Sequence, residues 1–108
     1  MTSEERKNLA LGMLADVRNY LDMTWVDVAG DYKLSGLVMR GMVYLDGIAG
    51  EDLDYSEEGQ PRALLFDYCR YGRSNALDEF AGNYQHELLA LQMASQITRA
   101  IEGEGDTA

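Results

Sequence analysis

Residues 64–91 read LLFDYCRYGRSNALDEFAGNYQHELLAL, and this stretch is the most informative part of the chain for the fold. Before Gly72, apolar side chains recur at spacings of three and four residues, at Leu64, Leu65, Tyr68 and Tyr71. After Gly72, the same spacing links Leu77, Phe80, Tyr84, Leu88 and Leu91. Such spacing places side chains on one face of an α-helix. The stretch therefore predicts two helices that meet at a tight corner, where Gly72 ends the first and Ser74 or Asn75 caps the second.

The residues around this corner are predicted to have a structural role. They are Tyr68, Tyr71, Arg73, Asn75, Phe80 and Tyr84. An aromatic stripe at helical spacing is usually part of a core, so the tyrosine hydroxyls must find partners or reach the surface. Arg70 and Arg73 precede Asp78 and Glu79 across the corner, where opposite charges could fix the interhelical angle or bridge to a neighbouring subunit. We favour the structural role, because exposed ion pairs contribute only about 0 to 1 kcal/mol.

The rest of the chain predicts further helices. A first helix should start near Ser3 and point Ala10, Met13, Leu14, Val17 and Leu21 inward. A second should run from about Val28 to Ala49 and stop at Gly50, and a third should begin at Pro61. Trp25 is expected to be an apolar anchor between the first two. Gly36 and Gly41 weaken the second helix, which suggests that another helix approaches closely at both positions.

The predicted fold class is all-α: a small bundle of four main helices, with an acidic loop between helices two and three and a long C-terminal helix. At 108 residues and 46% apolar content, the chain suits one domain. We assign residues 1–101 to that domain and residues 102–108 to a disordered acidic tail.

The fourth helix, expected over residues 76–101, would be about 39 Å long and its neighbour only half that length. Its far end should therefore overhang the domain. Met93, Ile97 and Ile101 lie on that end, and exposed apolar residues are natural contacts for another subunit. These three residues are predicted to form a subunit contact.

The segment between helices two and three is rich in carboxylates and is interpreted as an exposed loop. Its candidate interaction residues are Glu51, Asp52, Asp54, Tyr55, Glu57 and Glu58. A solvated charge run and a charged docking loop both fit this composition. A calcium site fits poorly, because the central glycine and terminal glutamate of an EF-hand loop are missing.

No catalytic, cofactor-binding or metal-binding residues are predicted. His86 is the only histidine and Cys69 the only cysteine, so the ligands of a zinc site are lacking. We expect His86 to be a solvated surface residue and Cys69 a buried small hydrophobe. The net charge of −10 opposes binding to nucleic acid. The N-terminus has no apolar signal core and no segment could span a membrane, so we expect a soluble, intracellular protein.

Several short motifs together resemble those of the head-to-tail connector proteins of tailed bacteriophages and prophages. They comprise residues 16–21, the helix over residues 27–48, Leu53-Asp-Tyr, Tyr68-x-x-Tyr71-x-Arg73-Ser-Asn75, and Glu79-Phe80-x-x-Asn83-Tyr84. The resemblance lies in their order and spacing and covers most of the chain.

This resemblance implies a structural protein without an enzymatic step. Such subunits assemble as a ring beneath the portal of a DNA-filled capsid and join it to the tail. The implied partners are the portal protein and tail-completion proteins, with the acidic loop as the portal-docking segment. The implied location is the host cytoplasm during assembly and then the virion neck. The alternative is a small acidic helical regulator or scaffold, encoded by a phage or prophage, that binds one protein. A metal-dependent hydrolase that uses the acidic loop is a third possibility, which bound divalent cation and turnover would reveal.

Overall fold

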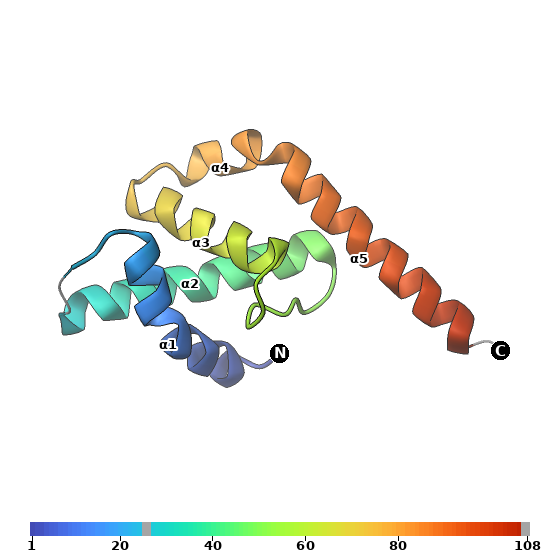
Figure 1. Cartoon of the computed structure of the whole chain (residues 1–108), viewed down its shortest axis with the longest axis horizontal. Coiled ribbons are helices and arrows are strands. Elements are labelled where there is room, and N and C mark those ends of the chain that lie inside the picture. Colours follow the sequence, from blue (N-terminus) through green and yellow to red (C-terminus); the bar gives the residue numbers. More distant parts are fainter. Residues whose placement is uncertain (25–26, 107–108) are drawn as a thin grey trace.

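The computed structural model describes residues 1–24 and 27–106, with side chains described as far as Glu102. All regular elements in these ranges are α-helices, in agreement with the predicted fold class. They are α1 (Ser3–Tyr20), α2 (Val28–Ala49), α3 (Gln60–Arg73), α4 (Leu77–Asn83) and α5 (Gln85–Asp106). Figure 1 shows α1 to α3 packed together, α4 above α3, and α5 running away from them toward the C-terminus. The predicted anchor Trp25 lies outside the described residues.

The three helices α1, α2 and α3 form the core because each has one continuous apolar face. The predicted inward stripe of α1 is confirmed, since Ala10, Met13, Leu14, Val17 and Leu21 are all buried. The cap of α1 is Thr2 and not Ser3: the Thr2 hydroxyl oxygen accepts a hydrogen bond from the amide of Glu5 at 3.1 Å. Helix α2 has the predicted limits, and Gly50 ends it in the left-handed conformation with φ of +78°.

Two glycines allow the core helices to approach closely. A Cβ atom on Gly41 would lie 2.6 Å from Leu65 Cδ1 of α3, so the close approach predicted at this position is confirmed. A Cβ atom on Gly72 would lie 2.4 Å from Leu37 Cδ1. Gly72 therefore serves packing and does not end α3, which continues to Arg73. The prediction for Gly36 is wrong as far as the described residues go, because a Cβ atom there would meet only the Arg40 side chain of the same helix, at 3.7 Å.

The helix predicted over residues 76–101 is two helices, so the bundle of four main helices is not what the structure shows. The break falls at Tyr84, directly after Gly82 and Asn83, which are weak helix formers. The ring centroid of Tyr84 lies 4.7 Å from that of Phe80, four residues earlier, so the two rings stay in contact across the break. Helix α5 then continues to Asp106, five residues past its predicted end at Ile101, while residues 107 and 108 lie outside the described range.

Helix α5 is attached to the core mainly through its first half and through Arg99. Leu88 and Leu91 are buried against the core. Further along, the Arg99 guanidinium donates hydrogen bonds to the carbonyls of Gly50 at 3.2 Å and Ala49 at 3.4 Å. These carbonyls belong to the C-terminal end of α2, where cationic groups are favoured. Arg99 thus sets the angle at which α5 leaves the core.

Candidate interaction surfaces

The acidic loop over residues 51–59 is fastened to the core by a buried carboxylate. Asp46 of α2 is 7% exposed and accepts hydrogen bonds from the Tyr55 hydroxyl at 2.7 Å and from the Leu53 amide at 3.0 Å. Arg6 of α1 donates to the same carboxylate at 3.3 Å. Arg62 of α3 donates to the carbonyl of Tyr55 at 3.0 Å. The loop is therefore held by three helices at once.

The prediction of a wholly exposed loop is wrong for two residues. Leu53 and Tyr55 are buried, at 8% and 1% exposure, because their side chains complete the core between α1, α2 and α3. Burial and the hydrogen bond to Asp46 raise the pKa of the Tyr55 phenol far above its ordinary value of 10.0. Tyr55 cannot serve as a surface contact in this conformation.

Most carboxylates of the loop reach the surface, and two of them have cationic partners in the chain: Asp52 pairs with the N-terminal ammonium, and Glu58 lies 3.6 Å from Arg62. Asp52, Asp54, Glu57 and Glu58 are exposed, while Glu51 is half-buried beside Arg99 at 3.9 Å. The hydroxyl and amide of Ser56 hydrogen-bond the Asp54 carboxylate and lower its pKa. The loop therefore presents ionised oxygens on a backbone that is fixed from below.

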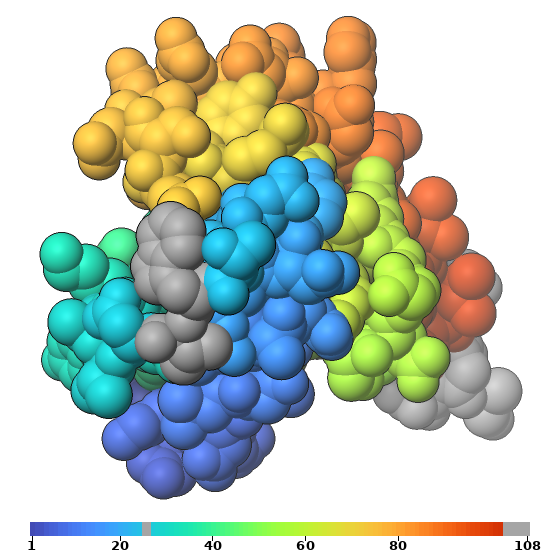
Figure 2. All heavy atoms as spheres, turned by 60° about the vertical axis from the view of Figure 1, so that its left-hand side comes forward, coloured from blue at the N-terminus to red at the C-terminus, as the bar shows by residue number. Residues whose placement is uncertain are grey.

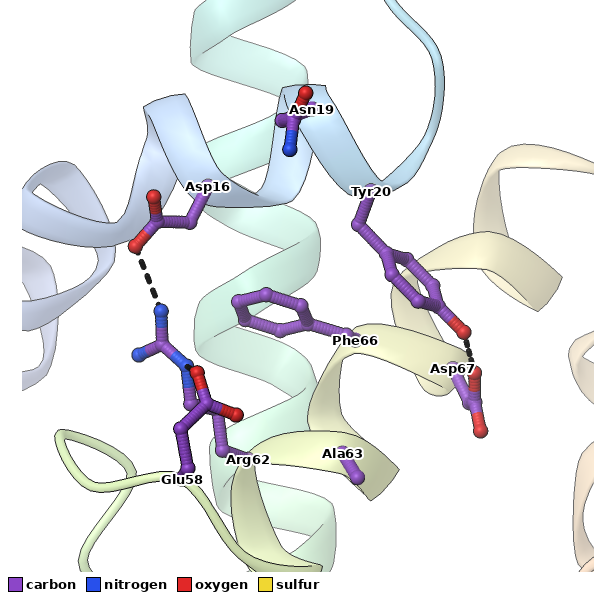
Figure 3. A pocket seen from close by; sticks show the side chains of 8 residues that line it. All are labelled: Asp16, Asn19, Tyr20, Glu58, Arg62, Ala63, Phe66 and Asp67. Atoms are coloured by element: carbon purple, nitrogen blue, oxygen red, sulfur yellow. Dashed lines mark hydrogen bonds and ion pairs between the residues drawn. The ribbon is translucent and has the colours of Figure 1, made fainter.

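Figure 2 shows the blue surface of α1 beside the yellow-green surface of the loop end and the start of α3. A shallow cavity of about 410 Å³ opens beside this loop, between α1 and α3. Figure 3 shows Arg62 at one end of it, between Asp16 and Glu58, and the Tyr20 hydroxyl directed at Asp67 at the other. Arg62 donates to Asp16 at 2.7 Å and lies over the Phe66 ring at 4.7 Å. Hydrogen bonding to Asp67 raises the pKa of Tyr20. The polar groups are thus engaged with one another, and they join α1 to α3.

Aromatic packing holds the corner between α3 and α4. Phe80 is 1% exposed and its ring centroid lies 5.5 Å from those of Tyr68 and Tyr71. The Tyr71 hydroxyl accepts from Asn83 at 3.0 Å, and the Tyr84 hydroxyl accepts from Arg70 at 2.9 Å. These two tyrosines therefore have the partners that a half-buried hydroxyl requires.

The polar residues of the corner act differently from the prediction. Asn75 adopts a left-handed conformation with φ of +56°, and neither it nor Ser74 caps α4, whose N-cap is Ala76 without a side-chain hydrogen bond. Arg73 donates to the Leu21 carbonyl at 3.4 Å. Among the ion pairs of the described residues, none joins Arg70 or Arg73 to Asp78 or Glu79. Ring packing and backbone geometry, and not charge pairing, define the angle.

Helix α5 exposes an apolar face along most of its length. Leu89, Met93, Ile97 and Ile101 are 52%, 52%, 58% and 63% exposed and follow one another at intervals of four residues. At 3.6 residues per turn they lie on the side of the helix opposite to Leu88, Leu91 and Ser95, which are buried. We call these four residues the outer face of α5. Met93, Ile97 and Ile101 thus lie where the sequence predicted them, on a projecting helix and open to contact (Figure 1).

The chemistry-bearing residues are dispersed. Cys69 is fully buried, as predicted, and burial raises the pKa of its thiol to about 12. His86 is exposed, also as predicted. In the described ranges, His, Cys, Asp and Glu side chains nowhere gather in threes as a metal ion would require. No helix in these ranges is long and apolar enough to cross a membrane.

Sequence reasoning missed Asp46, Arg62 and Arg99, the residues that join elements. A signal existed for Asp46, which falls four residues after Met42 and three before Ala49, both on the buried face of α2. A carboxylate at a core position indicates a buried polar partner. Comparison with protein-family models, with characterised proteins and with solved structures found no match.

Proposed function

We propose that this chain is a structural subunit of a phage head-to-tail connector, which assembles as a ring beneath the portal and joins the capsid to the tail. The observation that carries the proposal is the outer face of α5. Four large apolar side chains, each more than half exposed, lie along a helix that projects from the core. Such a surface is typical of a protein that contacts another protein. We propose a connector in particular because the order and spacing of the motifs in residues 16–84 resemble those of that family.

Ring assembly suits a subunit of this kind. A closed ring repeats one contact between every pair of neighbours, so contacts that are weak in dilute solution become sufficient on a template. A portal would be such a template. The net charge of −10 fits a channel for DNA, because carboxylates facing the lumen would repel the phosphate backbone and let the DNA slide.

The acidic loop is the proposed portal-docking segment, with Asp52, Asp54, Glu57 and Glu58 as its contact residues. They are exposed on a loop that Leu53 and Tyr55 anchor in the core, so docking would lose little conformational entropy. The half-buried Glu51 is a lesser contact.

Mixing the purified protein with portal rings tests the proposal. A connector should form a stoichiometric annular complex that electron microscopy and sedimentation detect. Neutralising Asp52, Asp54, Glu57 and Glu58 to Asn or Gln should leave the helical content unchanged and abolish the complex. The matched control is neutralisation of four carboxylates exposed elsewhere, Glu4, Glu5, Asp78 and Glu79. Failure of the wild-type protein to bind any portal ring encoded beside it would refute the connector function.

The same experiment separates the alternative, an acidic regulator or scaffold. Such a protein would bind one partner with fixed small stoichiometry and would form no annular complex. Substitution of both Ile97 and Ile101 by Asp adds a second test. It should suppress self-association of a ring subunit, whereas it would leave a monomeric regulator unchanged in sedimentation.

A further inference from the structure

A groove runs along α1 beside the end of the acidic loop and the start of α3. The cavity of about 410 Å³ described above forms one part of it. A second hollow of about 690 Å³ adjoins the first toward the start of α1, and Asp16 and Arg62 line both. We call the two hollows together the α1 groove. One wall is the side of α1 from Glu5 to Tyr20, and the other consists of residues between Ser56 and Asp67.

Apolar side chains and a glycine line the α1 groove. Met13 is buried, and Leu9 and Phe66 are half-buried. Gly12 lies on the same wall as Leu9, and a Cβ atom there would meet nothing within 4 Å. Glycine weakens a helix interior relative to alanine, so its presence calls for a reason. A small residue in the groove lets the backbone of a partner approach α1, as Gly41 lets α3 approach α2.

The α1 groove carries an excess of negative charge. Four carboxylates line it, from Glu5, Asp16, Glu58 and Asp67, and the only cationic lining residue is Arg62. The Arg62 guanidinium is shared between Asp16 at 2.7 Å and Glu58 at 3.6 Å. Asp67 has Arg70 at 3.6 Å, and Glu5 takes part in none of the ion pairs found among the described residues. The groove would therefore attract cationic groups and repel anionic ones.

Arg62 shows how this surface holds a cation (Figure 3). Its guanidinium donates to the Asp16 carboxylate and lies over the Phe66 ring at 4.7 Å. A carboxylate and an aromatic face are the two groups that favour a guanidinium or ammonium ion. Toward the end of α1, the Asp67 carboxylate and the half-exposed Tyr20 ring offer the same pair of groups to a second cation.

The described chain leaves the α1 groove open. The residues on both sides of positions 25 and 26 are held near Arg18: the Met23 amide donates to the Arg18 carbonyl at 2.9 Å, and Asp31 of α2 accepts from the Arg18 side chain at 2.9 Å. At 3.6 residues per turn, Arg18 lies on the other side of α1 from Gly12 and Asp16. Figure 1 shows that α5 also ends away from α1. The described chain thus supplies no occupant for the groove.

We propose that the α1 groove binds a basic amphipathic helix of another protein. The apolar side of this helix would lie against Leu9 and Phe66, and its lysine or arginine side chains would reach the carboxylates of both walls. From Glu5 to Tyr20 the groove follows α1 for about 22 Å, so a helix of about four turns would fill it. The inference goes beyond the connector function, since any protein with such a segment would fit.

Titration with synthetic peptides tests the proposal. The probe is a helical peptide of about 15 residues with leucine on one face and lysine on the other. One control peptide has the same composition in scrambled order, and another has glutamate in place of lysine. Amide chemical shifts of the ¹⁵N-labelled protein should change mainly in residues 5–20 and 56–67. The scrambled peptide should bind at least about tenfold more weakly, and the glutamate peptide should not bind.

Matched lysine variants locate the binding site. Gly12→Lys should keep the fold, since the added side chain meets open space, but should weaken binding about tenfold by filling the groove and repelling the peptide. Asn8→Lys, on the same wall, should act in the same direction. Gly47→Lys on α2 changes the net charge equally, also meets open space, and should leave the affinity unchanged.

Four outcomes would overturn the proposal. Equal binding of the scrambled peptide would show that net charge alone attracts these peptides. Shift changes centred on the outer face of α5 would assign binding to that surface. Full affinity in Gly12→Lys and Asn8→Lys, with helical content unchanged by circular dichroism, would place the peptide outside the groove. Absence of binding by the leucine–lysine helix at any concentration tested would refute the groove as a site for basic helices.

Discussion

Replacement of Asp46 by Ala should unfasten the acidic loop and destabilise the whole domain. The carboxylate is 7% exposed and accepts from the Tyr55 hydroxyl at 2.7 Å and the Leu53 amide at 3.0 Å. Hydrogen bonds to a charged group contribute about 1.5 to 3 kcal/mol each, so the two together represent about 3 to 6 kcal/mol. The substitution also relieves the cost of burying the charge, which places the expected loss near the lower limit, at about 3 kcal/mol.

Arg6 should increase the loss of stability in the Asp46→Ala variant. Its guanidinium lies 3.3 Å from Asp46, and its Nε atom is buried without a hydrogen-bond partner. Without Asp46, Arg6 would retain only Asp52, at 4.0 Å. A partly buried cation that loses its partner adds to the destabilisation. A loss of this size is a large part of the 5 to 15 kcal/mol typical of a domain.

Urea unfolding followed by circular dichroism measures the free energy, and digestion with a protease that cleaves after glutamate measures release of the loop at Glu57 and Glu58. Asp54→Ala is the matched control, because Asp54 is exposed and hydrogen-bonds only Ser56 within the loop. It should change stability by less than about 0.5 kcal/mol. The reasoning is refuted if Asp46→Ala lowers the free energy of unfolding by less than about 1 kcal/mol, or if the protease cleaves this variant no faster than Asp54→Ala.

Three further outcomes are expected. Gly41→Ala should destabilise the protein by about 1 to 3 kcal/mol because the added methyl group clashes with Leu65. Gly47→Ala in the same helix should stabilise it by up to about 1 kcal/mol, because alanine favours the helix and meets open space. Thermal unfolding compares the two variants, and a change in stability of the same sign for both would contradict the packing argument. Arg99→Ala should change global stability by less than about 1 kcal/mol while amide exchange in the second half of α5 accelerates; unchanged exchange would show that Arg99 does not hold the helix. Because folding raises the pKa of Tyr55, its contribution is complete below about pH 10 and is lost above it, with a slope of at most about 1.4 kcal/mol per pH unit. Tyr55→Phe should therefore flatten the fall in stability between about pH 10 and 11, and equal slopes for both proteins would contradict this assignment.

The helical periodicity predicted the core well. The inward residues of α1, the limits of α2 and the burial of Cys69 agree with the structure, because apolar spacing of three and four residues determines which side of a helix can leave water. The exposure of Met93, Ile97 and Ile101 was also predicted, although the single helix over residues 76–101 on which that prediction rested is two helices. Helix breaks and caps were predicted less well. The break at Tyr84 follows Gly82 and Asn83, which are weak helix formers, whereas the apolar spacing used for the prediction continues across it.

The acidic loop shows the limit of local reasoning most clearly. Its carboxylates predicted exposure, and four of them are exposed, but Tyr55 is buried. The burial of Tyr55 depends on its hydrogen bond to Asp46, nine residues earlier, and on Arg6, which contacts Asp46 from forty residues before it. A hydrogen-bonding partner so far along the chain is identified only once the helices have packed.

By itself, the sequence determined that this chain forms amphipathic helices, where most of them lie, and that its surface is acidic, because helical period, glycine position and charge are local properties. Tertiary structure alone decided which glycines lie where two helices pack closely and which residues of the acidic loop are buried. Those features depend on how much of each helix its neighbours cover. Which part of a helix is covered depends on segments far away in the sequence, so the residues of that helix alone do not reveal it.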